Sequence, residues 1–264
     1  KHQSKRILIL GESHYDKDGY NDFTTDSVVQ NFYSNPGEKK YQFFHKIAKC
    51  FFENVKNLVS HDNGNTFRVI CEQLDILGYK YTSQVLNAMH YGNVAQNRER
   101  IYIVAFRDKE DYDKFHWPLS IPLNSSVRDI IDFASKVDDK YYYVKGKYKG
   151  DIYEQLVNAM RNDEKSNPAI YQWRRKYVRK NKSGVVPTLT ANQGEGGHNV
   201  CLIHTDDNKI RKMTPRECFN AQGFPKDFKL PTNMSESRLY KQAGNSVCVS
   251  VIERIAGNIK EVVE

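Results

Sequence analysis

The chain has 264 residues, 39% of them hydrophobic, with 13 Phe and 17 Tyr, and this predicts a globular protein of one large domain or two modest ones. No apolar run approaches the roughly 20 residues of a membrane span, and the N-terminus has no signal-peptide pattern, so we expect a cytoplasmic protein. Forty Lys and Arg against 32 Asp and Glu give a net charge of +8, which favours polyanionic partners.

The cysteines are odd in number, widely spaced and set in apolar surroundings. This argues against a disulfide framework or a Cys-x-x-Cys metal site, so we predict no metal and a reducing compartment. Such cysteines are most often small core residues. The five are Cys50, Cys71, Cys201, Cys218 and Cys248, and none follows a proline.

The first hundred residues alternate between strand and helix patterns. Residues 5–10 predict a buried strand that ends at Gly11, and residues 41–52 predict a helix that leads into a strand near Phe51. Residues 63–78 have an amphipathic helical period with a stop at Gly78, and residues 79–88 and 100–106 are typical of strands. Strand, helix, strand indicates an α/β fold. The apolar positions of the helix are Phe67, Ile70, Cys71, Leu74 and Leu77.

Residues 108–183 are polar and rich in tyrosine and lysine, which predicts a smaller, irregular inserted domain. Within it, the segment 172–182, "QWRRKYVRKNK", mixes basic residues with Trp173 and Tyr177, a composition suited to phosphates and to stacking on sugars or bases. A solvated charged loop is the alternative interpretation of this segment.

Two helices are expected after the inserted domain. Thr214 as N-cap, Pro215 at the first helical position and Glu217 in a capping box predict a helix that Gly223 ends. A turn then leads to a last helix. Its expected apolar positions are Val247, Val251, Ile252, Ile255 and Ile259.

Five motifs then follow in one order: Glu-Asn-Val at 53–55, Gln-x-Arg-x-Arg at 96–100, a variable basic segment, "VVPTLTANQGEGGHN" and "LYKQAGNSV". Over residues 52–256 this order resembles the C-terminal portion of the DNA (cytosine-5)-methyltransferases. The resemblance implies an α/β fold with a partial Rossmann-like methyltransferase sheet and a smaller, irregular target-recognition domain. It implies a rear catalytic part at 51–107, target recognition at 108–200 and a return to the catalytic domain at 201–264.

The resemblance also implies roles in catalysis. Glu53 would face the ring N3 and exocyclic amine of a flipped cytosine, and Arg100 its O2, where a fixed guanidinium offsets charge developing in the ring. Arg98, on the same side of the strand by the two-residue period, would orient the site and nearby backbone. Salt bridges on the face of a sheet are the alternative interpretation of all three residues.

Further residues are implied to bind ligands. Gly244, in a tight turn before the last helix, would lie beside an S-adenosylmethionine pocket, together with Asn245, Ser246 and Val247. An ordinary glycine turn is the alternative. The residues expected to contact DNA are Gln96, Trp173, Arg174, Arg175, Lys176, Arg179, Thr188 and Thr190.

The sequence departs from the family at the nucleophile. It contains neither a Pro-Cys loop nor a Phe-x-Gly-x-Gly turn after a first strand, and Cys50, on an expected buried strand, is a poor candidate. Residues 1–50 are therefore interpreted as an α/β segment foreign to the family. Their "RILILGESHY" is faintly similar to the opening of uracil-DNA-glycosylase-like proteins, in which Glu12 and His14 could act, although a polar strand end is the simpler interpretation.

Three hypotheses remain open. The first is S-adenosylmethionine-dependent methylation of C5 of cytosine in duplex DNA, as in restriction-modification systems. On this hypothesis the single chain is incomplete, and a second polypeptide supplies the nucleophile and the glycine-rich cofactor loop. The second is a non-catalytic DNA-binding target-recognition module. The third assigns the function to a hydrolase-like or glycosylase-like N-terminal remnant.

Overall fold

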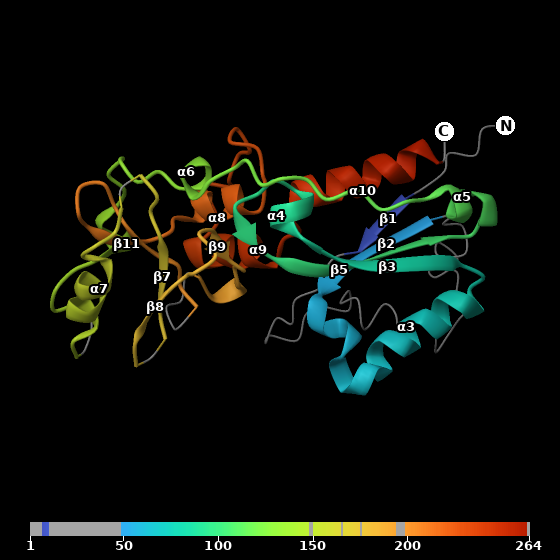
Figure 1. Cartoon of the computed structure of the whole chain (residues 1–264), viewed down its shortest axis with the longest axis horizontal. Helices are drawn as coiled ribbons and strands as arrows, with labels where there is room; N and C mark the ends of the chain where they lie inside the picture. The colour runs from blue at the N-terminus through green and yellow to red at the C-terminus, as the bar shows by residue number, and fades with distance from the viewer. Residues whose placement is uncertain are drawn as a thin grey trace. The chain divides into compact units, whose positions relative to one another are not determined.

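The computed structural model describes residues 7–10, 49–147, 150–164, 166–174, 176–193 and 199–262. The expected helix within residues 41–52 falls almost wholly outside this part of the chain. Glu12, His14 and Arg175 also lie outside the described residues. Backbone contacts divide the chain into two compact units (Figure 1). Unit 1 holds residues 1–86, 99–119 and 253–264, and unit 2 holds residues 87–98 and 120–252.

Unit 1 is built on a four-stranded sheet in the order β1-β2-β5-β3. β1 (Ile7–Leu10) runs parallel to β2 (Lys49–Val55), and β2 runs antiparallel to β5 (Glu99–Phe106), which lies beside β3 (Lys80–Asn87). The expected strands near residues 5–10, 51, 80 and 100 therefore exist and share one sheet. The α/β prediction is confirmed.

The two faces of this sheet differ in character. Cys50, Ile101 and Ile103 point to one face and form a buried cluster with Leu74 of helix α3 (Asn65–Ile76). On the other face Phe51 stacks on Tyr102, with ring centroids 5.8 Å apart. Figure 1 shows α3 on one side of the sheet and the unit 1 part of α10 (Val249–Glu261) on the other.

Helix α3 begins two residues later than the predicted start at residue 63. Asp62 (φ 51°), Asn63 (φ 53°) and Gly64 (φ 85°) are all left-handed, which no right-handed helix accommodates. These residues belong to the second of two short 3₁₀ turns, η2 (Lys56–Val59) and η3 (His61–Gly64). The predicted stop is confirmed, because Gly78 follows the helix with φ 76°.

Shorter segments complete unit 1. Helix α5 (Lys109–Lys114) follows β5, and Asp108 caps its start by accepting a hydrogen bond from the backbone N–H of Glu110. Asn258 and Arg254 of α10 donate to the carbonyls of His116 and Leu119. No helix within the described ranges is long and apolar enough to cross a bilayer.

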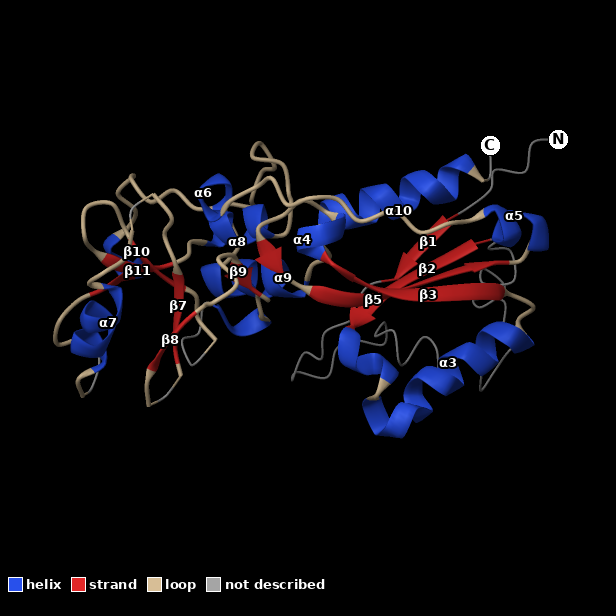
Figure 2. Ribbon diagram, viewed as in Figure 1, coloured by secondary structure: helices blue, strands red, loops and turns tan. Residues whose placement is uncertain are grey.

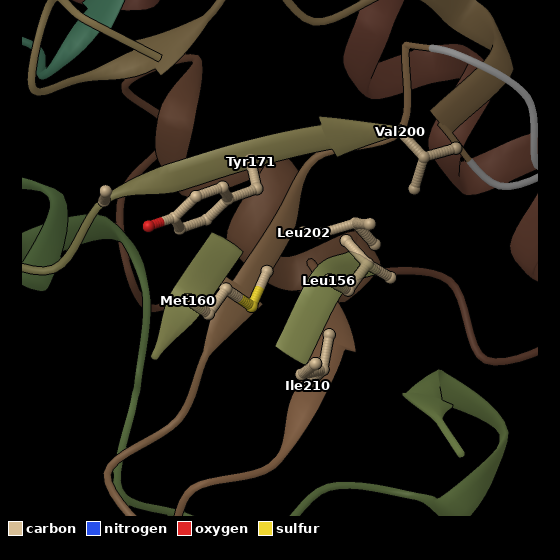
Figure 3. Packing of buried hydrophobic residues seen from close by; sticks show 7 residues of the cluster. Leu156, Met160, Tyr171, Val200, Leu202 and Ile210 are labelled. Carbon is tan, nitrogen blue, oxygen red and sulfur yellow. The ribbon is translucent and has the colours of Figure 1, made fainter. Parts of the chain in front are cut away.

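Unit 2 contains a five-stranded antiparallel sheet in the order β6-β11-β10-β7-β8, drawn red in Figure 2. Helix α7 (Ile152–Met160) packs on this sheet through a buried cluster that includes Leu156, Met160 and Tyr171 (Figure 3). The strands are β6 (Tyr142–Tyr143), β7 (Ile170–Trp173), β8 (Val178–Lys180), β10 (Leu202–His204) and β11 (Ile210–Lys212).

The rest of unit 2 is made of short elements. β4 (Gln96–Asn97) pairs in parallel with β9 (Val186–Pro187). Gln96 lies opposite Val186, which is 90 residues later in the chain. The short helices are α4 (Ala88–Tyr91), α6 (Val127–Ile130), η4 (Asp139–Tyr141) and η5 (Ala191–Gln193). The two units differ from the domains expected from the sequence. Residues 108–119 were expected in the target-recognition domain but belong to unit 1, and β10 and β11 were expected in the catalytic domain but belong to the sheet of unit 2.

Helix α8 (Pro215–Ala221) confirms its predicted signals. Thr214 is the N-cap, Pro215 is the first helical residue, and the backbone N–H of Thr214 donates to Glu217 Oε2 at 2.7 Å in the capping box. Gly223 follows the helix with φ 76°. The turn expected around Gly244 is wrong, however, because Gly244 lies inside helix α9 (Glu236–Asn245).

Candidate functional site

Glu53 and Arg100 form an ion pair within unit 1. In the antiparallel register Glu53 lies opposite Tyr102 and Val55 opposite Arg100, so Glu53 and Arg100 are diagonal neighbours on one face. Arg100 Nε lies 3.2 Å from Glu53 Oε1. The two residues are 8% and 3% exposed. The two side chains expected to flank one flipped cytosine therefore lie together, in the salt bridge that the alternative interpretation also describes.

Burial makes each of these two charges depend on the other. Removing one partner of a buried pair leaves an uncompensated charge in a poorly solvated place. Arg100 Nη1 also donates to the carbonyl of Glu99 at 2.9 Å, which fixes the plane of the guanidinium. Arg100 Nη2 makes no hydrogen bond to the described residues. The site therefore presents a fixed carboxylate beside a fixed guanidinium.

Gln96 and Arg98 make contacts of a different kind, all inside unit 2. Both are almost fully buried, at 0% and 2% exposure. Arg98 donates to three backbone carbonyls: Leu189 at 3.2 Å, Gly244 at 3.3 Å and Ser246 at 2.8 Å. Gln96 donates to the carbonyl of Ala221 and accepts from the N–H of Leu189 at 3.3 Å. The expected direct contact of Gln96 with DNA does not fit this position, because its amide is already used within the protein.

The residues expected at the cofactor pocket have distinct environments. Gly244 is buried in α9, where a Cβ would lie 2.6 Å from Ala191 N and even closer to the Thr190 carbonyl. Ser246 Oγ donates to the carbonyl of Ala243 at 2.9 Å. Asn245 is half-buried and its amide makes no hydrogen bond to the described residues, and Val247 is half-buried. These residues fit a ligand in part. Asn245 has a half-buried amide and Val247 a half-buried apolar side chain that a ligand could contact, whereas Gly244 allows α9 to pack closely against residues 190–191.

The basic segment forms a hairpin of β7 and β8. Trp173 pairs with Val178 and packs partly against the α7 core, and Arg174 Nη1 donates to Asn199 Oδ1 at 2.8 Å. Lys176 and Arg179 are exposed, and neither makes a side-chain hydrogen bond or ion pair with the described residues. The expected contact residues therefore divide into partly anchored side chains and exposed basic ones.

The threonines of the "PTLT" segment are partly buried. Thr188 Oγ1 donates to the carbonyl of Asn97 at 2.7 Å. This hydrogen bond joins the segment to β4, in addition to the pairing of β4 with β9 and the hydrogen bond between Leu189 and Gln96. Thr190 Oγ1 is buried and has no hydrogen-bond partner among the described residues. Thr188 and Thr190 therefore lie on a segment that is held tightly to β4.

The cysteines are unsuited to nucleophilic attack. Cys50 is buried on the α3 face of β2, opposite to the face that carries Glu53, and burial raises the pKa of its thiol. Burial also raises the pKa of Cys201 to about 12, and it raises the pKa values of Cys218 and Cys248. Within the described ranges no group of His, Cys, Asp and Glu could hold a metal ion.

The sequence interpretation missed the partner of Glu217. Arg211, on β11 and fully buried, donates to both oxygens of this carboxylate at 2.8 and 2.7 Å. The same carboxylate accepts from the N–H of Asp132 at 3.1 Å. A capping-box glutamate indicated the helix start, but no local pattern marked Arg211 as its ion-pair partner.

The sequence is similar to those of proteins of known family. Residues 45–261 match the profile of the C-5 cytosine-specific DNA methylase family. The Type II methyltransferase M.Bsp6I of Bacillus sp. (strain RFL6) is 57% identical over 214 residues, which are 81% of this chain and 65% of that protein. M.HhaI of Haemophilus parahaemolyticus is 35% identical over 232 residues, 81% of this chain and 63% of that protein.

Solved structures agree on the fold. The S. pombe Dnmt2 methyltransferase is similar with a TM-score of 0.62 at 13% identity, over 97% of this chain and 78% of that one. The chain spans just under two thirds of the length of M.Bsp6I and M.HhaI. The family match begins at residue 45, so the interpretation of residues 1–50 as a foreign segment stays a prediction. The chain belongs to the C-5 cytosine-specific DNA methylase family.

Proposed function

We propose that this chain is the part of a DNA (cytosine-5)-methyltransferase that grips duplex DNA and holds the target cytosine, with S-adenosylmethionine as methyl donor. The observation that carries the proposal is the buried pair of Glu53 and Arg100, 3.2 Å apart on one face of the sheet. Two of the relatives above are Type II methyltransferases, so we place the activity in a restriction-modification system in the cytoplasm.

The geometry suits recognition of an extrahelical cytosine. Flipping the base out of the duplex costs a few kcal/mol in stacking and pairing, which contacts to its Watson–Crick edge offset. The Glu53 carboxyl would meet ring N3 and the exocyclic amine, and a proton held at N3 makes C6 more open to nucleophilic attack. Arg100 Nη2, with no hydrogen bond to the described residues, would donate to O2 while Nε stays on Glu53.

The methyl donor would be held in part by this chain. S-adenosylmethionine supplies the methyl group, and among the four residues expected at its pocket Asn245 and Val247 have half-buried side chains available to it. The nucleophile is a separate matter, because no cysteine in the sequence follows a proline and Cys50 lies on the opposite face from Glu53. We therefore propose that turnover requires a Pro-Cys loop and a Phe-x-Gly-x-Gly cofactor loop, neither of which occurs in these 264 residues.

Transfer of labelled methyl groups to duplex DNA tests this proposal. The purified chain alone is expected to transfer none, and addition of a family fragment that carries the two loops is expected to restore transfer. In the restored system Glu53→Gln should abolish transfer. Glu99→Gln, which alters an exposed ion pair with Lys56 at the start of β5, should not. Robust transfer by the chain alone, lost in Cys50→Ser, would overturn the assignment of an incomplete site.

A second candidate function is a non-catalytic DNA-binding module. The exposed Lys176 and Arg179 on the β7–β8 hairpin favour it, because they are free to contact phosphates. Absence of methyl transfer in the supplemented system, with duplex binding intact, would favour this candidate.

A further inference from the structure

Leu189 is held at both of its peptide groups by one short stretch of chain. Its N–H donates to Gln96 Oε1 at 3.3 Å, and its carbonyl accepts from Arg98 Nη1 at 3.2 Å. The partners are 93 and 91 residues away in sequence. Residues on either side of Leu189 are the threonines to which we assign DNA contact, so Gln96 and Arg98 fix the position of that segment.

The same two side chains also reach the end of helix α9. Arg98 Nη2 donates to the carbonyls of Gly244 and Ser246, at 3.3 and 2.8 Å. Gln96 Nε2 lies 3.4 Å from Gln222 Oε1, and Gln222 Nε2 donates to the carbonyl of Ala243 at 2.7 Å. Each side chain therefore joins Leu189 to residues 243–246, Arg98 directly and Gln96 through Gln222.

Backbone packing makes this junction stiff. A Cβ on Gly244 would lie 2.6 Å from Ala191 N, so α9 and the segment after Leu189 touch without an intervening side chain. Gln96, Arg98 and Gln222 are buried, so water cannot replace the hydrogen bonds that a displacement would break. A shift of Leu189 alone would break the buried hydrogen bond from Arg98 Nη1, whereas a shift that carries the carbonyls of Gly244 and Ser246 with it would keep all three hydrogen bonds.

We infer that Gln96 and Arg98 are positioning residues that couple the DNA-contacting segment 188–190 to the cofactor segment 244–247. The inference rests on the proposed function, which assigns the methyl donor to the second segment, and on the expected contact of Thr188 and Thr190 with DNA. Coupling is reciprocal. DNA that orders the first segment therefore raises the affinity of the second segment for the methyl donor, and a bound donor raises the affinity of the first segment for DNA by the same factor. The physical element is one buried guanidinium shared by the two segments.

Amide hydrogen exchange of the full chain, with and without a duplex that contains cytosines in varied contexts, tests the coupling without turnover. In the wild type, the duplex should slow exchange at 188–193 and also, by about fivefold or more, at 242–247. Arg98→Lys keeps the charge but cannot reach three carbonyls, so protection should remain at 188–193 and vanish at 242–247. Arg128→Lys, which alters an exposed bidentate pair with Asp206 in the same unit, should behave as the wild type.

Each other result counts against the inference in a distinguishable way. Protection at 188–193 with none at 242–247 in the wild type overturns the coupling alone. Protection at 242–247 that persists in Arg98→Lys means that DNA touches α9 directly, and this also overturns it. Protection at neither segment removes the proposed DNA contact and the inference together. If Arg98→Lys loosens unit 2 without DNA, Gln96→Met supplies the same comparison, with loss of transmission expected.

Discussion

Substitution of Gly244 by alanine tests the contact between α9 and the segment 190–191. The added Cβ would lie 2.6 Å from Ala191 N and closer still to the Thr190 carbonyl, distances that real Cβ atoms do not adopt. The obstructing atoms are backbone and cannot rotate away. Overpacking of this kind costs about 1–3 kcal/mol, and the upper half of that range applies here. The gain in helix propensity, at most about 1 kcal/mol near a helix end, offsets part of it.

The net expectation is a loss of about 1–2 kcal/mol in the free energy of unfolding of unit 2. With a urea m value of about 2 kcal/mol/M, the unfolding midpoint falls by about 0.5–1 M. The chain has two tryptophans, Trp117 in unit 1 and Trp173 in unit 2, so Trp117→Phe leaves fluorescence that reports unit 2. The reverse background, Trp173→Phe, reports unit 1.

Gly257→Ala is the matched control. Gly257 lies in the interior of α10 with nothing within 4 Å of an added Cβ, so only the propensity gain applies. We expect this variant to raise the unit 1 midpoint. A unit 2 midpoint that stays the same or rises in Gly244→Ala would refute the claim that these backbones touch.

Three further predictions concern DNA binding, the buried ion pair and the thiols. The double variant Lys176→Ala with Arg179→Ala should weaken duplex binding in titrations at several salt concentrations and flatten the log–log salt slope by up to about 1.8, or 0.9 per lost phosphate contact; an unchanged slope would make the hairpin a solvated face. Glu217→Gln should lower stability by about 3–5 kcal/mol in urea unfolding, because a buried arginine loses its counter-charge, and a loss under 1 kcal/mol would contradict this. Iodoacetamide at neutral pH should alkylate Cys50 far more slowly than Cys71 in native protein, because Cys50 is buried whereas Cys71 is half-buried, and equal rates would contradict this. Burial raises the pKa of both thiols, so access of the reagent sets the difference.

Elements with local signals could be predicted closely. Helix α8 is marked by Thr214, Pro215, Glu217 and Gly223, each within a few residues of the end that it sets. The start of α3 was placed two residues early because the helical period says nothing about backbone handedness. Asp-Asn-Gly at 62–64 is the turn chemistry that tolerates positive φ and could have corrected it.

The site could be predicted where strand alternation holds. Glu53 and Arg100 lie inside continuous antiparallel strands, so the two-residue period and the family order bring them to one face. Arg98 lies between β4 and β5, where the ladder is interrupted, and its partners are 91 to 148 residues away. No local pattern specifies such partners, so its three carbonyls emerged only with the tertiary structure.

The sequence separation of these contacts bears on when the protein can become competent during synthesis. Gln96 contacts residues 93 and 125 positions later, and Arg98 reaches Ser246, 148 positions later. High contact order delays folding, because loop closure must precede the contacts that reward it. A nascent chain can form the α7 cluster early, but Arg98 can donate to all three of its carbonyl partners only after Ser246 has emerged from the ribosome. Until then Arg98 cannot make all three of these hydrogen bonds, and the contacts that position segment 188–190 are incomplete.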